Sequence, residues 1–362
     1  MITIEEINSY DKASSLKDRW DKLIDEAGFD ISLSFDFTAS LWEAHLDKKD
    51  IILLVARDDN DIIGIFPLVI CKKRFFGAVP VTTIGPLSNI FCFHNNFMCK
   101  ARVDECFKAV LNHLSKRHPK WDVFEINNAC EDSNIMGIIK QDHFKDLLRF
   151  DGEDAPYVKL EGSWDEYINK KSGNFRHNLR RKEEAFQEGG NSRIMELRSP
   201  GDVDAILKKM YEIEKESWKE KADISIALDE KQRRFYESYL KKTASADRLL
   251  ATFLQIADED IAFMLHILHR RICFQLKMAY KDKFKERSPG FVSNKYMVKK
   301  LFDMGFEEYD FLIGNPRWKQ EWATGARKTF NFYIYNNNRF YSNCIYRIKT
   351  MILLLRIWKQ NS

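Results

Sequence analysis

Two stretches of the chain share one pattern of apolar and polar positions. Residues 51–70, IILLVARDDNDIIGIFPLVI, contain an apolar run, an acidic turn and a second apolar run, and residues 249–268, LLATFLQIADEDIAFMLHIL, repeat that order. Apolar runs of this length around a turn predict β-hairpins. Each follows a helical segment rich in aromatic residues, LSFDFTASLWEAHL before the first and KQRRFYESYLKK before the second. The repeated order predicts an internal duplication, although acidic hairpin turns are common enough to arise independently.

The elements that follow the two hairpins differ. After the second, the sequence predicts a strand at 272–280, a helix opening at 288–290, a strand at 307–314, a short helix at 317–324 and a strand at 327–337. After the first comes FFGAVPVTTIGPLSNIFCFHNN, which contains no counterpart of the Ser-Pro-Gly helix start. If both halves have one fold, the second is the better candidate for ligand binding.

The segment Arg287-Ser288-Pro289-Gly290 predicts a helix start with one unusual residue. Ser288 can cap the free backbone amides, and Pro289 suits the first helical position because its missing N–H costs nothing there. Gly290 lowers helix propensity. It is explained if a ligand must approach the backbone, since a helix N-terminus attracts anions. The alternative is a well-capped helix with an incidental glycine, and these residues alone leave both interpretations open.

A basic helical segment opens the second half. Ser163 and Glu166 have the spacing of a capping box, and Gly189-Gly190 is typical of a helix end. Gly173 predicts a break between two helices. The basic residues of this segment are Arg176, His177, Arg180, Arg181 and Lys182. Such a cluster is either a solvated helix face or a binding site for an anionic substrate, and Arg176 and Arg180 are the candidate substrate-binding residues.

Length and composition indicate a globular protein of two domains. The 362 residues are too many for one ordinary domain, and 44% hydrophobic content supplies ample core. Lys and Arg total 58 against 54 Asp and Glu, so the net charge of +4 does not favour a nucleic-acid partner. The seven cysteines form no CxxC and no metal-ligand spacing, which fits free thiols in a reducing cytosol and predicts no metal.

The C-terminal tail departs from this balance. No acidic residue follows Glu321, and the basic residues beyond it are Arg327, Lys328, Arg339, Arg347, Lys349, Arg356 and Lys359. The tail CIYRIKTMILLLRIWKQ is too short in apolar length to span a bilayer. It is either an element docked on the core or a membrane-surface helix in peripheral contact with the inner membrane face.

These features predict three segments and a location. A crossing near FDGEDAPYVKLEG separates an N-terminal half at 1–155 from a C-terminal half with the ligand site at 156–344, and the tail occupies 345–362. The N-terminal sequence MITIEEINSYDKASS lacks an apolar signal core. The expected location is therefore cytoplasmic.

The ordered set of motifs resembles the GNAT acyltransferase superfamily. More specifically it resembles the CelD/BcsL-type acetyltransferases, first named from cellulose biosynthesis, and more distantly the Fem-type peptidyltransferases. The segments that carry the resemblance are SWDEYINKKSGNFRHNLRRKEEAFQEGG, DEDIAFMLHIL, RSPGFVSNKYM, YDFLIG and WKQEWATGARK, with FDFTASLW and DIIGIFPL in the first half. The resemblance covers most of the chain. It implies an α/β (α+β) fold of tandem GNAT-like halves, each a mixed, mostly antiparallel sheet flanked by helices, with the first half degenerate.

The sequence departs from the family pattern at two places. Arg287–Gly290 is shorter than the basic, glycine-rich loop of many GNAT enzymes, a feature that the CelD-like group shares. In that group a Tyr-Lys pair often follows the Asp-Phe strand, whereas this chain has Trp318-Lys319. The change keeps the lysine and removes the aromatic hydroxyl.

The resemblance implies acyl transfer to an amine from acetyl-CoA or another acyl-CoA. In GNAT folds the strand before the binding helix pairs with the pantetheine arm, and its amides are candidate donors to the thioester carbonyl. The strand residues expected to bind the cofactor are Lys277, Met278, Ala279 and Tyr280. The residues expected to bind its pyrophosphate are Arg287, Ser288, Pro289, Gly290 and Phe291, with Lys285 as a further source of charge.

Four side chains are candidates for proton transfer. Asp310 is an acid within an apolar strand, which favours a functional or ion-paired role over a passive one. Lys319 is either the partner of Asp310 or a contact for substrate or cofactor. His266 has a suitable ordinary pKa, but a single histidine in an apolar strand is more often a core residue. Tyr280 is the candidate acid for the leaving thiolate, and tyrosines that only pack are equally common.

The leading hypothesis is an acyl-CoA-dependent N-acyltransferase. Trp218 and Lys219 fall where such proteins place an acceptor-binding loop, although Trp218 is equally explained as a core residue. The family resemblance suggests a small amine or amino sugar of surface-polysaccharide synthesis as acceptor. The alternatives are a Fem-like transferase that uses aminoacyl-tRNA and a GNAT-like binding module without activity. The sequence does not indicate the acyl chain length or the oligomeric state.

Overall fold

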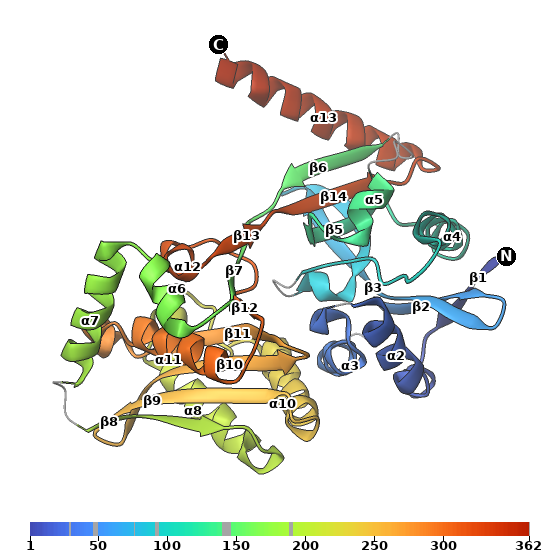
Figure 1. The fold of residues 1–362 in the computed structure, drawn as a ribbon. Helices are drawn as coiled ribbons and strands as arrows, with labels where there is room; N and C mark the ends of the chain where they lie inside the picture. The colour runs from blue at the N-terminus through green and yellow to red at the C-terminus, as the bar shows by residue number, and fades with distance from the viewer. Residues whose placement is uncertain are drawn as a thin grey trace. The chain divides into compact units, whose positions relative to one another are not determined.

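The chain folds into two compact units in a computed structural model (Figure 1). Unit 1 comprises residues 1–153 and 328–362, and unit 2 comprises residues 154–327. The structure describes residues 1–28, 30–45, 50–75, 77–90, 94–139, 146–187 and 191–361. Of residues 89, 90, 139 and 356–361 it describes the backbone only.

Unit 1 is built on a seven-stranded sheet. In spatial order its strands are β1 (Ile2–Ile7), β2 (Ile51–Asp58), β3 (Asp61–Phe75), β4 (Val79–Pro86), β5 (Val123–Cys130), β14 (Thr329–Tyr335) and β6 (Leu147–Asp151). Its helices are α1 (Tyr10–Ser14), α2 (Lys17–Ala27), α3 (Phe35–Ala44), α4 (Val103–Arg117), α5 (Asn134–Ile139) and α13 (Phe340–Asn361), with short 3₁₀ turns η1 (Ile31–Leu33) and η3 (Leu87–Ile90).

Unit 2 is built on a second seven-stranded sheet. In spatial order its strands are β8 (Ser192–Leu197), β9 (Leu249–Ile256), β10 (Glu259–His269), β11 (Ile272–Tyr280), β12 (Glu308–Asp310), β7 (Ala155–Lys159) and β13 (Gly325–Arg327). Its helices are α6 (Trp164–Lys170), α7 (Gly173–Gln187), α8 (Val203–Lys215), α9 (Trp218–Lys221), α10 (Glu230–Ser245), α11 (Pro289–Asp303) and α12 (Arg317–Trp322), with 3₁₀ turns η4 (Pro200–Asp202) and η5 (Asp282–Arg287).

The two sheets have the same plan. In each, the fourth and fifth strands are parallel, β4 with β5 and β11 with β12, and every other neighbouring pair is antiparallel. The predicted hairpins are β2–β3 and β9–β10, which occupy the second and third positions of their sheets. The predicted fold class, two mixed and mostly antiparallel sheets with helices around them, is confirmed.

The sixth strand of each sheet comes from an unexpected part of the chain. We expected residues 328–344 to belong to the C-terminal half, but β14 pairs with β5 and β6 in unit 1. Its side chains Phe332 and Ile334 lie in the core of that unit. The sixth position of unit 2 is filled by β7, which pairs with β12. Alternating apolar residues in β14 predict a strand, and do not reveal which sheet buries it.

Local sequence signals located most helix boundaries. The Ser163 hydroxyl accepts a hydrogen bond from the Glu166 amide at the start of α6, as the capping box predicts. The break before Gly173 is present, because α6 ends at Lys170 and α7 begins at Gly173. The predicted helix end at Gly189-Gly190 lies outside the described residues. Residues 340–344 belong to α13, so the tail helix begins five residues before the predicted 345.

Candidate functional site

The sheet of unit 2 opens between β11 and β12. β11 has nine residues, but only its first three pair with β12, from Ile272 opposite Glu308 to Phe274 opposite Asp310. Beyond that point β12 ends and β11 continues to Tyr280. Among the described residues, the second half of β11 therefore pairs with a strand on one edge only, with β10.

The backbone groups of Met278 and Tyr280 point to this open edge. The Lys281 amide donates to the Ile261 carbonyl of β10. In an antiparallel ladder, residues two apart share the same direction, so Ala279 bonds toward β10 and its two neighbours point away. The Lys219 ammonium confirms this direction, because it donates to the Met278 carbonyl at 2.5 Å. The register with β10 also shifts beside Leu276, which is an extra residue in β11 of the kind that a β-bulge introduces.

Helix α11 starts beside this edge in a way that the sequence only partly predicted. Pro289 is the first helical residue, as expected. The expected side-chain cap is wrong: Ser288 makes no capping hydrogen bond, and its backbone is left-handed, with φ 51° and ψ 49°. A non-glycine residue in this region costs on the order of 1 kcal/mol. The strained residue Ser288 therefore directly precedes helix α11, which the GNAT resemblance implicates in cofactor binding.

The backbone amides of Ser288, Gly290 and Phe291 are the ones expected to bind phosphate, and two of them already donate hydrogen bonds within the protein. The Ser288 amide donates to the Lys285 carbonyl at 3.0 Å, and the Phe291 amide donates to the Ser288 carbonyl at 2.9 Å. The Gly290 amide lies in the first turn, where a helix offers no acceptor. Of the three, Gly290 therefore keeps its donor for a ligand. The Phe291 side chain is buried in the core of unit 2.

Gly290 also has a packing reason. A Cβ atom at this position would lie 2.7 Å from Met278 Cε and 4.0 Å from Tyr280 Cδ1. The first turn of α11 therefore packs directly on the side chains of two residues whose backbone points to the open edge. The glycine lets the strand and the helix start approach each other.

Two basic side chains stand at the start of α11. Lys182 of α7 lies with its ammonium 3.9 Å from the centre of the Phe291 ring, and burial lowers the pKa of Lys182. Arg287 Nη1 is buried without a hydrogen-bond partner among the described residues. The other two predicted arginines behave differently: Arg176 donates to the Asn169 carbonyl at 3.2 Å, and Arg180 is exposed. The sequence placed Lys182 in a basic cluster, but could not show that it reaches α11.

Asp310 is an ion-paired residue of the strand. It is 2% exposed, and its carboxylate accepts the Leu312 amide at 2.7 Å and lies 3.4 Å from Arg327 Nη1. Arg327 also binds Glu308 with two contacts of 2.8 Å. Burial raises the pKa of Glu308, and Arg327 opposes that effect. The expectation that an acid here needs a charged partner agrees with this geometry, and the partner lies 17 residues further along the chain.

Lys319 stabilises the turn that follows Asp310. Its ammonium donates to the carbonyls of Phe311, Leu312 and Ile313 at 2.8, 3.3 and 2.9 Å. Leu312 is left-handed, with φ 58°, so the turn holds a strained residue. The side chain is nearly buried and directed at the backbone. This geometry favours a positioning role for Lys319 over direct contact with a substrate.

His266 and Tyr280 differ in access. His266 is fully buried, its Nε2 lies 3.0 Å from the Tyr309 hydroxyl, and burial lowers its pKa to about 3. It is therefore a neutral, fully buried side chain in the sheet. Tyr280 is half-buried beside Gly290. Burial and the nearby Asp282 raise the pKa of Tyr280, so the hydroxyl keeps its proton, as a proton donor to a thiolate requires.

A compact charged cluster lies on the other face of β11. Lys277 points toward α8 and α10, where it approaches Glu214 and Gln232, whereas the next residue, Met278, packs on α11. Lys219 binds Glu214 at 3.0 Å. Its neighbour Trp218 is 48% exposed, which excludes the interpretation of Trp218 as a core residue.

In unit 1, the places that correspond to the helix start and the open sheet edge of unit 2 are occupied by side chains of unit 1 itself. Helix α4, between the parallel strands β4 and β5, also follows a left-handed residue, Arg102 with φ 52°. Its first turn carries Asp104 and Glu105, which repel an anion. Arg102 itself is bound to Asp58 and Glu105. This helix start is therefore unsuited to phosphate.

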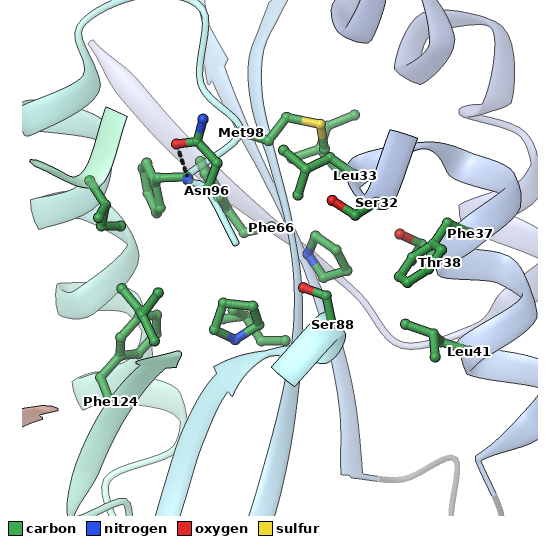
Figure 2. Close-up of a pocket in the computed structure, with 17 residues that line it drawn as sticks. Ser32, Leu33, Phe37, Thr38, Leu41, Phe66, Ser88, Asn96, Met98 and Phe124 are labelled. Atoms are coloured by element: carbon green, nitrogen blue, oxygen red, sulfur yellow. Dashed lines mark hydrogen bonds between the residues drawn. The ribbon is translucent and has the colours of Figure 1, made fainter. Parts of the chain in front are cut away.

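An apolar cavity lies where β4 and β5 separate in unit 1. Figure 2 shows Phe66, Met98 and Phe124 around it. Its volume is about 20 Å³, enough for about one water molecule. The stacked rings of Phe66 and Phe97, with centres 4.0 Å apart, help to close it. A cavity of this volume is too small for a pantetheine arm.

One protein-family model matches a segment that lies within unit 2. The acetyltransferase (GNAT) domain model matches residues 173–320, which contain β8 to β12 and α11. This segment is therefore similar to GNAT-type acetyltransferase domains. No curated protein matches the chain.

Several solved structures share the fold of the whole chain. They include FemX (11% identity, 92% of this chain and 98% of that one, TM-score 0.59). L-PGS from Bacillus licheniformis is similar (14% identity, 94% and 96% coverage, TM-score 0.59). So is a conserved protein of unknown function from Bacteroides thetaiotaomicron (11% identity, 92% and 100% coverage, TM-score 0.60). At these identities the likeness concerns the fold.

Among the described residues, no group of three or more His, Cys, Asp or Glu side chains is arranged to hold a metal ion. Within the same part of the chain, no helix combines the length and the apolar character needed to cross a bilayer.

Proposed function

We propose that unit 2 is an acyl-CoA-dependent N-acyltransferase. The observation that carries this proposal is the open edge of β11 beside the start of α11, where the Gly290 amide is available to an anion and the Lys182 ammonium lies 3.9 Å from the centre of the Phe291 ring. Arg287 directly precedes Ser288 at this helix start. The similarity of residues 173–320 to GNAT-type acetyltransferase domains supports the reaction class. Acetyl-CoA is the first acyl donor to test.

In this proposal the open edge binds the acyl arm. The amides of Met278 and Tyr280 point outward and can donate to the thioester carbonyl, which gains negative charge as the amine attacks. The new C–N bond forms as the C–S bond breaks. Tyr280 supplies its proton to the leaving thiolate, since its raised pKa keeps it protonated. The proton that the attacking amine loses then returns the Tyr280 phenolate to its neutral form. Asp310 and Lys319 hold the turn opposite β11 and act as positioning residues.

The acceptor in this proposal is an amine. The CelD/BcsL-type resemblance suggests an amino sugar of surface-polysaccharide synthesis, used in the cytoplasm. The test is release of CoA thiol from acetyl-CoA and longer acyl-CoAs with a panel of amines, with the acylated product identified by mass spectrometry. Transfer to an amine supports the proposal. Absence of transfer from every acyl-CoA, with folded protein, contradicts it.

A second candidate is a transferase that uses aminoacyl-tRNA. The fold shared with FemX and L-PGS over more than nine-tenths of the chain favours its inclusion, and Arg180 and Arg181 of α7 are exposed. Filter binding with aminoacyl-tRNA at several salt concentrations distinguishes it, because phosphate contacts give a steep salt dependence. Tight, salt-sensitive binding of tRNA together with no binding of acyl-CoA would favour this candidate.

The tail is proposed as a peripheral membrane contact. Helix α13 exposes Ile348, Met351, Leu354 and Leu355 next to the exposed Arg347, while Ile345 packs in the core of unit 1. Apolar side chains beside basic ones suit an anionic membrane surface. Flotation with anionic vesicles tests this, and removal of residues 350–362 is the better deletion because it keeps Ile345. Flotation that survives the deletion contradicts the proposal.

A further inference from the structure

Two lysines of unit 2 share one buried carboxylate. Glu214, near the end of α8, is fully buried, and the side chains of Lys219 and Lys277 are each 11% exposed. Glu214 Oε1 lies 3.0 Å from Lys219 Nζ and 3.5 Å from Lys277 Nζ. Its other oxygen accepts the Ile226 amide at 2.7 Å and lies 3.4 Å from the Ser225 hydroxyl. The carboxylate is therefore fully occupied.

The ammonium groups of this cluster outnumber the carboxylates that they contact. Two ammonium groups lie within salt-bridge distance of one carboxylate, that of Glu214. Asp229 also acts on Lys277, but its carboxylate caps α10 through the amides of Lys231 and Gln232. Tyr236, whose ring centre lies 5.4 Å from Lys277 Nζ, adds no charge. Buried charges normally have a close partner.

Lys277 lacks a short contact. Its ammonium lies 3.4 Å from the Gln232 side-chain oxygen and 3.5 Å from Glu214, whereas charge-assisted hydrogen bonds are about 2.7–2.9 Å long. Burial and then the neighbouring Lys219 lower the pKa of Lys277 to about 8, although Glu214 and Asp229 act in the opposite direction. Burial also lowers the pKa of Lys219. The first cause of both shifts is burial, which disfavours a charged ammonium group.

The position of the cluster connects it with the open edge. Lys219 donates to the Met278 carbonyl at that edge, and Lys277 extends from the same strand on the face of α8 and α10. The phosphate donors at α11 lie on the face of Met278, the opposite one. Exposed Trp218 flanks Lys219 in sequence. The lysine pair therefore lies on the face away from the expected cofactor phosphates.

We propose that Lys219 and Lys277 bind an oxyanion of the acceptor, so that the acceptor is an amine that also carries a carboxylate or a phosphate group. This inference rests on the proposed function, because it assigns the acceptor of that same site. The Lys277 ammonium supplies the N–H donors that make no short contact within the protein. Lys219 connects the cluster to β11 through its hydrogen bond to the Met278 carbonyl. The anion completes the contacts that Glu214 cannot provide to both lysines.

The first test measures anion binding without acyl transfer. Lysines of the intact protein are labelled with trace acetic anhydride, and the rate at Lys277 is read by mass spectrometry relative to exposed Lys215 of α8. Added succinate or inorganic phosphate is expected to slow labelling of Lys277 at least threefold and to leave Lys215 unchanged. The anion that protects better identifies the carboxylate or the phosphate source. Equal labelling of Lys277 with and without both anions overturns the inference.

The second test compares matched acceptors. Acyl transfer to glycine and glycinamide, and to phosphoethanolamine and ethanolamine, is measured for wild type, Lys277→Arg and Lys277→Met. We expect wild type and Lys277→Arg to prefer the anionic member of a pair at least tenfold in kcat/KM, and Lys277→Met to lose that preference. Lys277→Arg inactive with both members would instead make Lys277 a proton acceptor and overturn the inference. Protection of Lys277 by anions without transfer to any amine would contradict the proposed function alone.

Discussion

Replacing Lys277 with methionine should stabilise the protein. Methionine has a similar length and no charge, so it fills the space beside Tyr236 and removes the cation that faces Lys219. A residue kept for binding at the expense of folding stability is a common feature of functional sites. Loss of Lys277 would then raise stability while weakening selection of an anionic acceptor.

The magnitude follows from the lowered pKa. Burial lowers the pKa of Lys277 from 10.5 to about 8, and each tenfold change in proton affinity corresponds to about 1.4 kcal/mol. The protonated side chain therefore destabilises the folded state by at most about 3 kcal/mol. The cluster can relax after the substitution, and the unfolded chain retains some structure. We therefore expect Lys277→Met to raise the free energy of unfolding by about 1–3 kcal/mol at pH 7.

The gain should depend on pH with a definite sign. Below pH 8 the folded and unfolded chains both hold the Lys277 proton, so the cost of the buried charge is present in full. Between about pH 8 and 10.5 the unfolded chain holds the proton and the folded chain does not, so wild-type stability rises with pH. The advantage of Lys277→Met should therefore shrink over this window.

The assay is urea unfolding of the full chain at pH 7 and pH 9.5. Lys215→Met is the matched control, because Lys215 is exposed on α8 and its replacement should change stability by less than about 0.5 kcal/mol. A Lys277→Met variant less stable than wild type at pH 7 would refute the reasoning. So would a gain that is as large at pH 9.5 as at pH 7.

Two further predictions concern the other charged groups of unit 2. Arg327→Met leaves Glu308 and Asp310 buried without their cation. It should therefore cost about 3–5 kcal/mol of unfolding free energy in urea titrations at pH 7. Adding Glu308→Gln should recover part of this loss, and no recovery would contradict the pairing. Lys319→Met removes three donors from the carbonyls of residues 311–313 and should lower the free energy of unfolding by about 2–3 kcal/mol. It should also lower kcat/KM in the thiol-release assay. Unchanged stability would show that the turn holds without Lys319.

Sequence alone predicted the features that depend on neighbouring residues. The two hairpins, the Ser163 cap and the position of Pro289 are local, and they appear as expected. The Ser288 cap failed because the left-handed backbone directs the chain differently from an ordinary N-cap. That conformation also recurs at Arg102 of unit 1, although the two sequences share no motif there.

The features that sequence missed depend on contacts between distant segments. Lys182 reaches Phe291, Arg327 reaches Asp310, and Lys219 meets Lys277 through Glu214. In each case the residue types were visible as charges, but their partners lie on other elements. His266 shows the converse, since a single histidine in an apolar strand was correctly weighed as a core residue and is fully buried.

The most direct test of the central claim is calorimetric titration of the protein with acetyl-CoA. Wild type, Gly290→Glu and Gly290→Gln are compared, because both substitutions displace Met278 to a similar extent and only one adds a negative charge. The account predicts binding of one acetyl-CoA per chain with a Kd in the micromolar range, and a loss at least tenfold greater for Gly290→Glu than for Gly290→Gln. Absence of binding by folded wild-type protein, or equal losses in the two variants, would contradict a cofactor phosphate site at the start of α11.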